Sequence, residues 1–466
     1  MKNALTWLPF ALDYLDDWMN FQIERFKQPG CSIAVCKEGK LIAERAYGVA
    51  NIHTQQPLST KHYFRIASHS KTFTAAAIML LREQGKLQLD DPIGKFIKGL
   101  DKNLAKARIS QFLSHGAGVT RDGADSGQFR DSRPFLNAKE VMQELAQPQP
   151  LEAGLQLKYS NHGFALLGLL IERITGEPYA QWMSQHVIAA AGLKHIAPDM
   201  PHLASTAPFP SGHSAEFPFG QRLIIPGNNA LNAIASAGGF VATAADTARF
   251  FAQLAPSARK SILSAESRRE MLLRRWRDPV NLQEFHYGLG AMLSGPGAGE
   301  WFGHTGSLQG FISRTSHFLH SGYTITVLTN ASDGFAYPWV DGILNILQTF
   351  EQHGAPTDKA QSWRGRWWNM YAATDLVPMG DHVRATAPLQ FKPFDGAETV
   401  LQLTGLGTGK DTARIAKTSA FLSPGELVSR ARNRKGEVTA VRFAGSQMTT
   451  REAMVQETKQ RYASNL

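Results

Sequence analysis

The sequence predicts an α+β protein in which an antiparallel sheet is flanked by helices and joined to an all-helical subdomain, followed by a small C-terminal all-β barrel. Strand-like runs occur near residues 31–50 and again near 300–330, and the segment from about 75 to 235 is rich in helical patterns. This order favours a sheet covered by helices, with a site at their junction. After residue 355, short β-prone runs separated by turn residues predict the barrel.

Length and composition indicate a chain that can bury a large core. It has 466 residues, of which 43% are hydrophobic. Such a length predicts two or three domains. We expect a first domain at residues 1–355, with a helical subdomain at about 75–235, and a barrel at 356–466, because the character of the sequence changes after Gly354-Ala355-Pro356.

The N-terminal segment predicts an amphipathic helix of the fold. Its apolar start resembles a signal peptide, but no small-residue cleavage site is evident and aspartates follow at once. The helix is favoured because apolar residues recur on one face, namely Leu12, Leu15, Met19, Ile23 and Phe26. No run of the sequence is long enough for a membrane span.

The two cysteines, Cys31 and Cys36, lie in a predicted β-hairpin. The segment from Cys31 to Ala50 alternates in polarity around Lys37-Glu38-Gly39-Lys40. An odd offset sends the two thiols to opposite faces of a strand, so no disulfide between them is expected. Free buried thiols favour a reducing compartment, and we predict a cytoplasmic location, with the periplasm as the alternative.

Ser68 and Lys71 predict an activated nucleophile. They lie three residues apart at the start of an alanine-rich, apolar stretch. This stretch is typical of a helix, and Gly85 is expected at its C-terminal cap. On one helical face a hydroxyl and an amine come within hydrogen-bond reach, and a helix N-terminus favours an oxyanion. The alternative is that Ser68 only caps the helix. The same spacing recurs in Ser257 and Lys260, but no apolar run follows there.

Two further clusters favour a site over a helix cap. Tyr159 and Asn161 form the only Tyr-x-Asn of the chain and directly precede an apolar run. A phenol and an amide at this spacing can project into one cleft. The third cluster, His304-Thr305-Gly306-Ser307, precedes a β-rich run from Tyr323 to Leu328, and its glycine permits close approach of another backbone.

In order and spacing the three clusters resemble the serine β-lactamase and penicillin-recognising hydrolase superfamily, in particular its branch of class C β-lactamases, D-aminopeptidases, DD-carboxypeptidases and esterases. The resemblance runs from about Pro29 to Asn330 and implies a β-lactamase/transpeptidase-like fold. Further segments that carry it are Gly30-Cys31-Ser32-Ile33-Ala34-Val35, Leu89-Asp90-Asp91-Pro92, Leu113-Ser114-His115-Gly116-Ala117-Gly118, Ala237-Gly238-Gly239 and Tyr287-Gly288-Leu289-Gly290.

The resemblance implies three catalytic residues. Ser68 is implied as the nucleophile, and Lys71 and Tyr159 share the proton transfers. An ordinary lysine or tyrosine has a pKa of about 10 and is no base at neutral pH, so burial and neighbouring charges must shift one of the two pKa values. Which of the two residues is the general base stays open, because they titrate as a coupled pair.

The resemblance also implies substrate-binding residues. Asn161 would hold the lysine and donate to the amide oxygen of the substrate, while the backbone amides of Ser68 and Ser307 would form an oxyanion hole. The implied substrate-binding set is Asn161, His304, Thr305, Gly306 and Ser307.

His304 departs from the pattern of many β-lactamases, which have lysine at this position. Histidine is only partly charged near neutral pH, so a carboxylate clamp is weaker, which is more typical of D-aminopeptidases and DD-carboxypeptidases. We therefore predict a serine hydrolase that cleaves amide or ester bonds through an acyl-enzyme, in a small peptide or amide containing a D-amino acid. The alternatives are an esterase or weak β-lactamase of the same superfamily, and a non-catalytic penicillin-binding or sensing protein.

The C-terminal part is predicted to be a lipocalin-like barrel, because Gly365-Arg366-Trp367-Trp368 resembles the start of the barrel that several relatives append. Its β-prone runs are Ala372 to Val377, Thr399 to Leu403, Arg414 to Leu422 and Val438 to Phe443. The net charge of +10 includes a basic run at Arg430 to Lys435. We interpret that run as a solvated hairpin turn, since no recognition helix or base-stacking motif accompanies it.

Cofactors and partners are predicted from the motifs. The 15 histidines show no metal-ligand spacing. We expect no cofactor, no metal and no nucleic acid, and a small-molecule or short-peptide substrate as the partner; a homo-oligomer is compatible with the sequence. His69, His115 and His162 lie beside the motifs and are expected to shape the cleft rather than catalyse.

Overall fold

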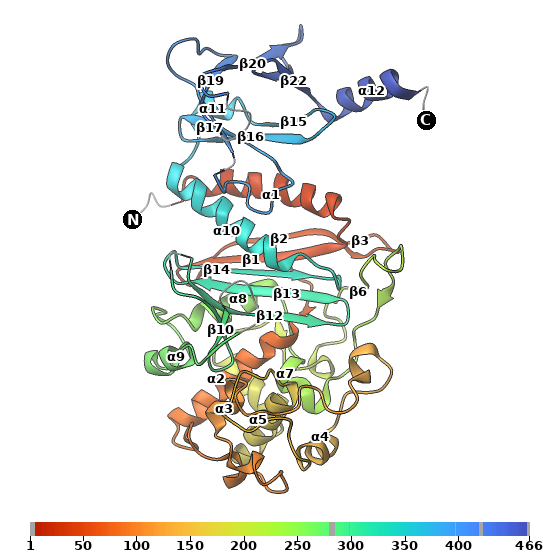
Figure 1. Cartoon of the computed structure of the whole chain (residues 1–466), viewed down its shortest axis with the longest axis vertical. Coiled ribbons are helices and arrows are strands. Elements are labelled where there is room, and N and C mark those ends of the chain that lie inside the picture. Colours follow the sequence, from red (N-terminus) through yellow and green to blue (C-terminus); the bar gives the residue numbers. More distant parts are fainter. Residues whose placement is uncertain (1–4, 279–284, 298, 397, 419–422, 464–466) are drawn as a thin grey trace. The chain divides into compact units, whose positions relative to one another are not determined.

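The fold is described from a computed structural model of the chain, which describes residues 5–278, 285–297, 299–396, 398–418 and 423–463 (Figure 1). The chain forms two compact units. The larger unit is Gln28–Val340, and the smaller unit combines Met1–Lys27 with Asp341–Leu466. The domain limits expected at residue 355 and at about 75–235 stay predictions.

An antiparallel sheet lies at the centre of the larger unit. Its described strands follow the order β3-β2-β1-β14-β13-β12-β11-β10-β9. Their bounds are β1 (Gly30–Lys37), β2 (Lys40–Asn51), β3 (Gln56–Pro57), β9 (Trp276–Arg277), β10 (Phe285–Tyr287), β11 (Met292–Ser294), β12 (Trp301–Leu308), β13 (Phe311–Phe318) and β14 (Tyr323–Thr329). The middle strands are the most deeply buried, so the sheet forms part of the core.

The predicted hairpin is formed by β1 and β2. Its turn residues Glu38 and Gly39 have φ angles of +49° and +78°. A two-residue hairpin turn of the type I′ class requires two such left-handed residues. Cys31 and Cys36 are buried and free, as expected from their odd offset.

Helices form the remainder of the larger unit's core. α8 (Ala244–Gln253) packs on β1, β13 and β14, while α2 (Ser70–Glu83), α5 (Asn161–Thr175) and α7 (Ala235–Gly238) pack on one another. Of these, α2, α5 and α7 lie below the sheet in Figure 1. The others are α3 (Ile109–Leu113), α4 (Ala138–Leu145), α6 (Tyr179–Trp182), α9 (Ala265–Met271), the π-helix η5 (Met183–Ala189), and the 3-10 turns η1 (Ala67–His69), η2 (Ile93–Lys95), η3 (Leu104–Lys106), η4 (Gly127–Arg130), η6 (Met200–His202) and η7 (Asn232–Ile234).

The segment predicted as helix-rich is helical mainly in its first two thirds. After η5 ends at Ala189, the chain forms loops and short strands instead. The reason is local, because Gly and Pro recur between residues 192 and 227 and interrupt helical periodicity. The short strands are β4 (Phe64–Arg65), β5 (Ile196–Ala197) and β8 (Val241–Ala242), which form one small sheet, and β6 (Gly212–His213) and β7 (Ile224–Ile225), which form another.

The smaller unit contains the predicted all-β barrel. Eight strands close it in the order β15 to β22. They are β15 (Gly365–Trp368), β16 (Ala373–Met379), β17 (His382–Thr386), β18 (Thr399–Gln402), β19 (Thr412–Lys417), β20 (Leu427–Arg432), β21 (Val438–Phe443) and β22 (Ser446–Thr449). Three of the four predicted β-runs coincide with β16, β18 and β21. The fourth begins in β19, and its residues 419–422 lie outside the described residues.

The predicted N-terminal helix is α1 (Leu8–Arg25), and it belongs to the smaller unit. Its buried face includes four residues that the apolar pattern did not mark, namely Ala11, Tyr14, Trp18 and Gln22. Trp18 Nε1 donates to the Gln390 carbonyl at 3.1 Å, and Gln22 Nε2 donates to the Pro388 carbonyl at 2.6 Å. Further helices are α10 (Ala336–His353), α11 (Asp358–Gln361) and α12 (Arg451–Tyr462). In the part of the chain that the structure describes, none is long and apolar enough to cross a membrane.

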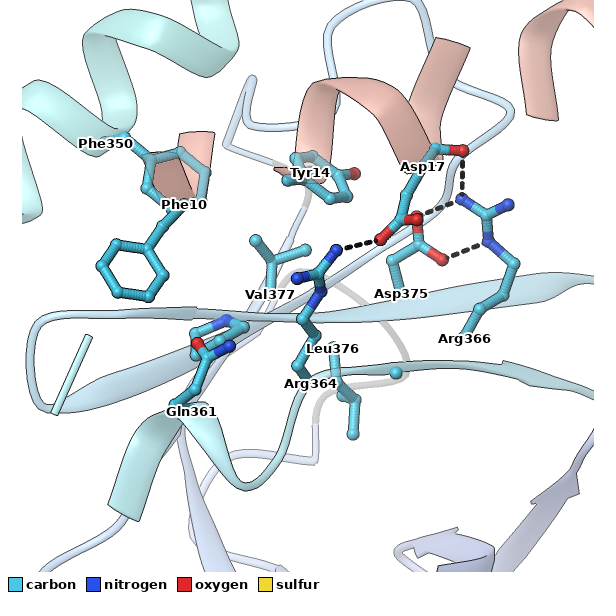
Figure 2. A pocket seen from close by; sticks show the side chains of 12 residues that line it. Phe10, Tyr14, Asp17, Phe350, Gln361, Arg364, Arg366, Asp375, Leu376 and Val377 are labelled. Atoms are coloured by element: carbon cyan, nitrogen blue, oxygen red, sulfur yellow. Dashed lines mark hydrogen bonds and ion pairs between the residues drawn. The ribbon is translucent and has the colours of Figure 1, made fainter. Parts of the chain in front are cut away.

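A cavity of about 170 Å³ lies between α1 and the barrel strands β15 and β16 (Figure 2). Arg366 donates to both carboxylate oxygens of Asp375, at 2.6 and 2.8 Å. Arg364 donates to Asp17 of α1 at 2.7 Å. Since these charges are paired with one another, the cluster ties α1 to the barrel, and the apolar rings of Phe10 and Phe350 line the remaining wall.

Candidate active site

Ser68 lies in the 3-10 turn η1, directly before α2. The sequence predicted a helix N-terminus here, and the structure places the serine two residues before α2 begins, after Ala67 with φ +48°. The turn is anchored to the sheet by buried His69, whose Nε2 lies 3.0 Å from Thr315 Oγ1 of β13. Burial lowers the pKa of His69 to about 3, so the ring is neutral and acts as a structural link.

Lys71 is fully buried in the first turn of α2. Its Nζ lies 3.1 Å from Ser68 Oγ, 2.7 Å from Asn161 Oδ1 and 2.7 Å from the Ala237 carbonyl oxygen. Desolvation holds the pKa of Lys71 well below its usual range, although the nearby carboxylate of Asp122 opposes this shift. An amine with a lowered pKa is available in its neutral form, which an exposed lysine is not.

Tyr159 reaches the same serine from the other side. Its hydroxyl donates to Ser68 Oγ at 2.8 Å. The residue directly precedes Ser160, the N-cap of α5, whose Oγ accepts from the amide of Gly163. His115 supports this position, because its Nδ1 accepts from the Ser160 amide at 3.1 Å and its ring centroid lies 4.1 Å from that of Tyr159. Burial raises the pKa of Tyr159 above its usual range, so the phenol keeps its proton.

The strand β12 carries the third predicted cluster. Pairing between β11 and β12 ends at Gly303, one residue before the cluster. Gly306 is required by packing, because a Cβ atom there would lie 2.3 Å from the carbonyl oxygen of Ile66. This close approach of two backbone segments is made to the turn that carries Ser68. This contact places β12 against η1.

His304 is buried and held at both ring nitrogens. Its Nε2 lies 2.9 Å from the Tyr287 hydroxyl, and its Nδ1 lies 2.7 Å from the Thr305 carbonyl oxygen. Desolvation, with smaller effects of His69 and Lys71, holds the pKa of His304 well below its usual range. The sequence led us to expect a partly charged ring, whereas burial makes it neutral near pH 7.

All of these residues line, or lie directly behind, one cleft of about 580 Å³ in the larger unit. The predicted binding residues Asn161, His304, Thr305, Gly306 and Ser307 all belong to its lining. The apolar part of the lining consists mainly of Phe129, Leu231, Ile234, Met292 and Leu308. The lining of the cleft therefore combines apolar side chains with polar and charged ones, as small-molecule sites do.

Two residues that contact the site were given no role from the sequence. Asp122 accepts from Asn161 Nδ2 at 2.6 Å, and Tyr287 holds His304. Asp122 lies in an irregular loop without periodic pattern, so no local signal marked it. Ser257 and Lys260, which repeat the spacing of Ser68 and Lys71, are exposed and do not line the cleft. No group of three or more His, Cys, Asp or Glu that could hold a metal ion occurs among the described residues.

The family assignment follows from comparison with known proteins. A family model described as Beta-lactamase matches residues 21–344, which is more than half of the chain. The chain belongs to the Beta-lactamase family. The superfamily resemblance of the three clusters is thereby confirmed.

A curated relative matches only in part. Protein flp of Staphylococcus aureus (strain MW2) is 27% identical over 187 residues, which cover 39% of this chain and 37% of that protein. The chain thus spans little more than a third of the length of that relative.

Solved structures show the same fold over longer stretches. The octameric penicillin-binding protein homologue from Pyrococcus abyssi superposes with a TM-score of 0.65 and 19% identity, covering 94% of this chain and 100% of that one. The D-amino acid amidase from Ochrobactrum anthropi SV3 gives a TM-score of 0.62 and 22% identity, covering 73% and 99%. At these identities the likeness establishes the fold, and the predicted α+β, β-lactamase-like class is confirmed.

Proposed function

We propose that the chain is a serine hydrolase that cleaves amide or ester bonds through an acyl-enzyme, with Ser68 as the nucleophile and Lys71 and Tyr159 as the proton-transfer pair. The single observation that carries this proposal is that Ser68 Oγ lies within hydrogen-bond distance of both Lys71 Nζ and the Tyr159 hydroxyl. A serine hydroxyl that lies between an amine and a phenol, inside a cleft, has the surroundings of an activated nucleophile.

The hydrogen-bond pattern favours Lys71 as the general base. The Asn161 Oδ1 and the Ala237 carbonyl oxygen can only accept, so they take two N–H groups of the amine. A neutral amine then directs its lone pair toward Ser68 Oγ. The lowered pKa of Lys71 and the raised pKa of Tyr159 support the same assignment, with a neutral amine beside a protonated phenol.

The proposed reaction has two steps. Ser68 Oγ attacks the substrate carbonyl carbon while its proton passes to Lys71, and the oxyanion forms against the backbone amides of Ser68 and Ser307. The leaving amine or alkoxide takes a proton through Tyr159, which is in turn resupplied from Lys71. Water then adds to the acyl-enzyme by the reverse sequence, with its proton accepted by the same pair and returned to Ser68.

We propose a small amide or peptide containing a D-amino acid as the substrate class. The buried, neutral ring of His304 supplies no cation for a substrate carboxylate, which disfavours efficient β-lactam turnover and favours amides. The solved structure from Ochrobactrum anthropi that shares the fold is a D-amino acid amidase. Ester hydrolysis and weak β-lactam turnover are the alternatives within the same chemistry, and placement in the class C-like branch is part of the proposal.

The assembly and location of the chain are further proposals. The fold relative from Pyrococcus abyssi is octameric, and a homo-oligomer is proposed for this chain on that likeness. Two free, buried thiols support a cytoplasmic location. Light scattering of the purified chain measures its oligomeric state. A single mass equal to that of the monomer contradicts the proposed homo-oligomer.

The central experiment labels the nucleophile. The full chain is treated with a fluorophosphonate or a fluorescent penicillin, and turnover is measured on a D-amino acid amide, an ester and a cephalosporin. Ser68→Ala is expected to abolish labelling and turnover, whereas the matched control Ser257→Ala, which alters the exposed copy of the motif, keeps both. Equal turnover by the Ser68→Ala variant contradicts the proposal, and stable labelling without any turnover favours a non-catalytic penicillin-binding or sensing protein.

A further inference from the structure

Asp122 is the sole carboxylate among the described residues that line the cleft. Its side chain is only 16% exposed, and its Oδ1 accepts from Asn161 Nδ2 at 2.6 Å. Its Oδ2 accepts from Arg121 Nε at 3.1 Å. The side chain of Arg121 is 66% exposed. A carboxylate this close to the substrate-binding amide and the buried lysine requires an explanation beyond surface solvation.

The loop that carries Asp122 is fixed to the start of α5. The amide of Asn161 donates to the Arg121 carbonyl at 2.9 Å. At Gly123, with φ +80°, a Cβ atom would lie 1.9 Å from the Glu144 carboxylate, which itself lies 2.6 Å from His162 Nε2 of α5. The backbone around Asp122 therefore has little freedom, and the carboxylate is held opposite Asn161.

The contacts of Asn161 determine which way its amide group faces. An ionised carboxylate can only accept, so Asp122 requires the nitrogen of the amide. The amide oxygen must then face Lys71, whose Nζ donates to it at 2.7 Å. One hydrogen of Nδ2 is used by Asp122, which leaves the second for another acceptor, and Asn161 lines the cleft in which a substrate carbonyl would bind.

We propose that Asp122 is a positioning residue that orients the Asn161 amide between Lys71 and the substrate, an inference that rests on the function proposed above. Its negative charge also acts on the balance between the charged and the neutral form of Lys71. Without the carboxylate, the amide of Asn161 can rotate and present its nitrogen to Lys71. Both the lysine and the substrate would then lose their partner.

The charges around Lys71 give the inference a directional test. Burial lowers the pKa of Lys71 most, Asp122 raises it and Arg121 lowers it. Tyr159, His115 and His304 also approach the lysine; burial holds the two histidines neutral and the phenol protonated. A unit charge two hydrogen bonds away changes a pKa by about 0.5 to 2 units. If neutral Lys71 is the base, the acylation rate falls at low pH as the amine becomes protonated. The pKa of Lys71 then sets the position of this acid limb in the pH–rate profile.

The experiment measures the rate of Ser68 acylation by a fluorophosphonate between pH 5 and 10, with intact-mass detection and the full chain. Asp122→Asn is expected to move the acid limb to lower pH by about 0.5 to 2 units and to reduce the plateau rate roughly tenfold or more. Arg121→Gln is expected to move the same limb to higher pH. The matched control is Asp125→Asn, a carboxylate of the same loop that is 61% exposed and pairs with Arg133; it leaves both readouts unchanged.

The outcomes separate the two proposals. Shifts in opposite directions for the Asp122 and Arg121 variants support the positioning role, since a purely structural loop residue would lower the amount of folded protein without moving the limb. An Asp122→Asn variant with unchanged limb and plateau, or two variants that shift in the same direction, overturns it. Failure of the natural chain to become labelled at Ser68 instead refutes the proposed function itself.

Discussion

At the scale of single residues, burial gives ordinary side chains the properties that the site requires. Desolvation lowers the pKa of Lys71 and raises that of Tyr159, so that one can accept and the other can donate a proton near neutral pH. The same effect makes the ring of His304 neutral. These three side chains differ in chemistry, but water exclusion acts on all of them.

Tyr159→Phe is expected to lower kcat/KM by about 10²- to 10⁴-fold, the usual contribution of one acid-base group. The substitution removes the hydroxyl that donates to Ser68 and keeps the ring that packs on His115. Steady-state kinetics on the best amide substrate measure it. Tyr179→Phe is the matched control, because that buried hydroxyl bonds Thr74 outside the cleft lining. If both variants lose activity equally, the role of Tyr159 is structural.

Buried histidines are expected to make the chain less stable in acid. The folded-state pKa of His317 is lowered from 6.5 to about 4 by burial. Between pH 6.5 and 4 the unfolded chain therefore binds a proton at this site that the folded chain does not. The free energy of unfolding falls as the pH drops through that window, by up to about 1.4 kcal/mol per pH unit for each such group.

His317→Asn tests this dependence by urea denaturation at several pH values between 7 and 4. Relative to the natural chain, the variant is expected to show a shallower fall of stability with decreasing pH, even where its absolute stability is lower. Parallel curves for the two proteins contradict the prediction.

At the scale of elements, the site depends on how closely β12 approaches η1. Gly306→Ala places a methyl group 2.3 Å from the Ile66 carbonyl oxygen, and backbone atoms cannot move aside as a flexible side chain can. We expect a loss of about 1 to 3 kcal/mol in the free energy of unfolding, together with slower acylation of Ser68. Gly299→Ala, before the same strand and with open space around its Cβ, is the control. Equal behaviour of both variants in urea unfolding and labelling contradicts the prediction.

The parts of the site that lie on regular elements could be predicted from the sequence. Lys71 is placed by a helical repeat, and Tyr159 and Asn161 are placed by the start of an apolar helix, so short patterns contain their geometry. The 3-10 turn at Ser68 could not be foreseen, because the left-handed Ala67 has no compositional signal. Asp122 was missed for a related reason, since its position depends on tertiary contacts of an irregular loop.

At the scale of the whole molecule, the smaller unit is assembled from two separated stretches of the chain. The barrel domain predicted from the sequence begins at residue 356, and the N-terminal helix is predicted as part of the first domain. No composition rule links α1 to the barrel, because the link consists of tertiary contacts such as the bond from Trp18 to the Gln390 carbonyl. The barrel itself was predictable, since alternation and turn residues are local.

Trp18→Ala is expected to destabilise the smaller unit by about 3 to 5 kcal/mol, as truncation of a fully buried tryptophan does. Hydrogen exchange measured peptide by peptide checks it, with faster exchange expected in the barrel strands. Asn20→Ala, on the exposed face of the same helix, should change stability by no more than about 0.5 kcal/mol. Unchanged exchange of the barrel peptides in the Trp18 variant would show that the barrel does not depend on α1.

The split composition of the smaller unit has a consequence for how a cell makes this chain. Translation delivers α1 before its barrel partner, with the whole larger unit between them. At about 5 to 20 residues per second, the apolar side of α1 waits on the order of tens of seconds for residues that can cover it. During that interval we expect the uncovered apolar side to be prone to aggregation and to benefit from a chaperone. A circular permutant that encodes α1 after β22 removes the delay and should express with less dependence on such help.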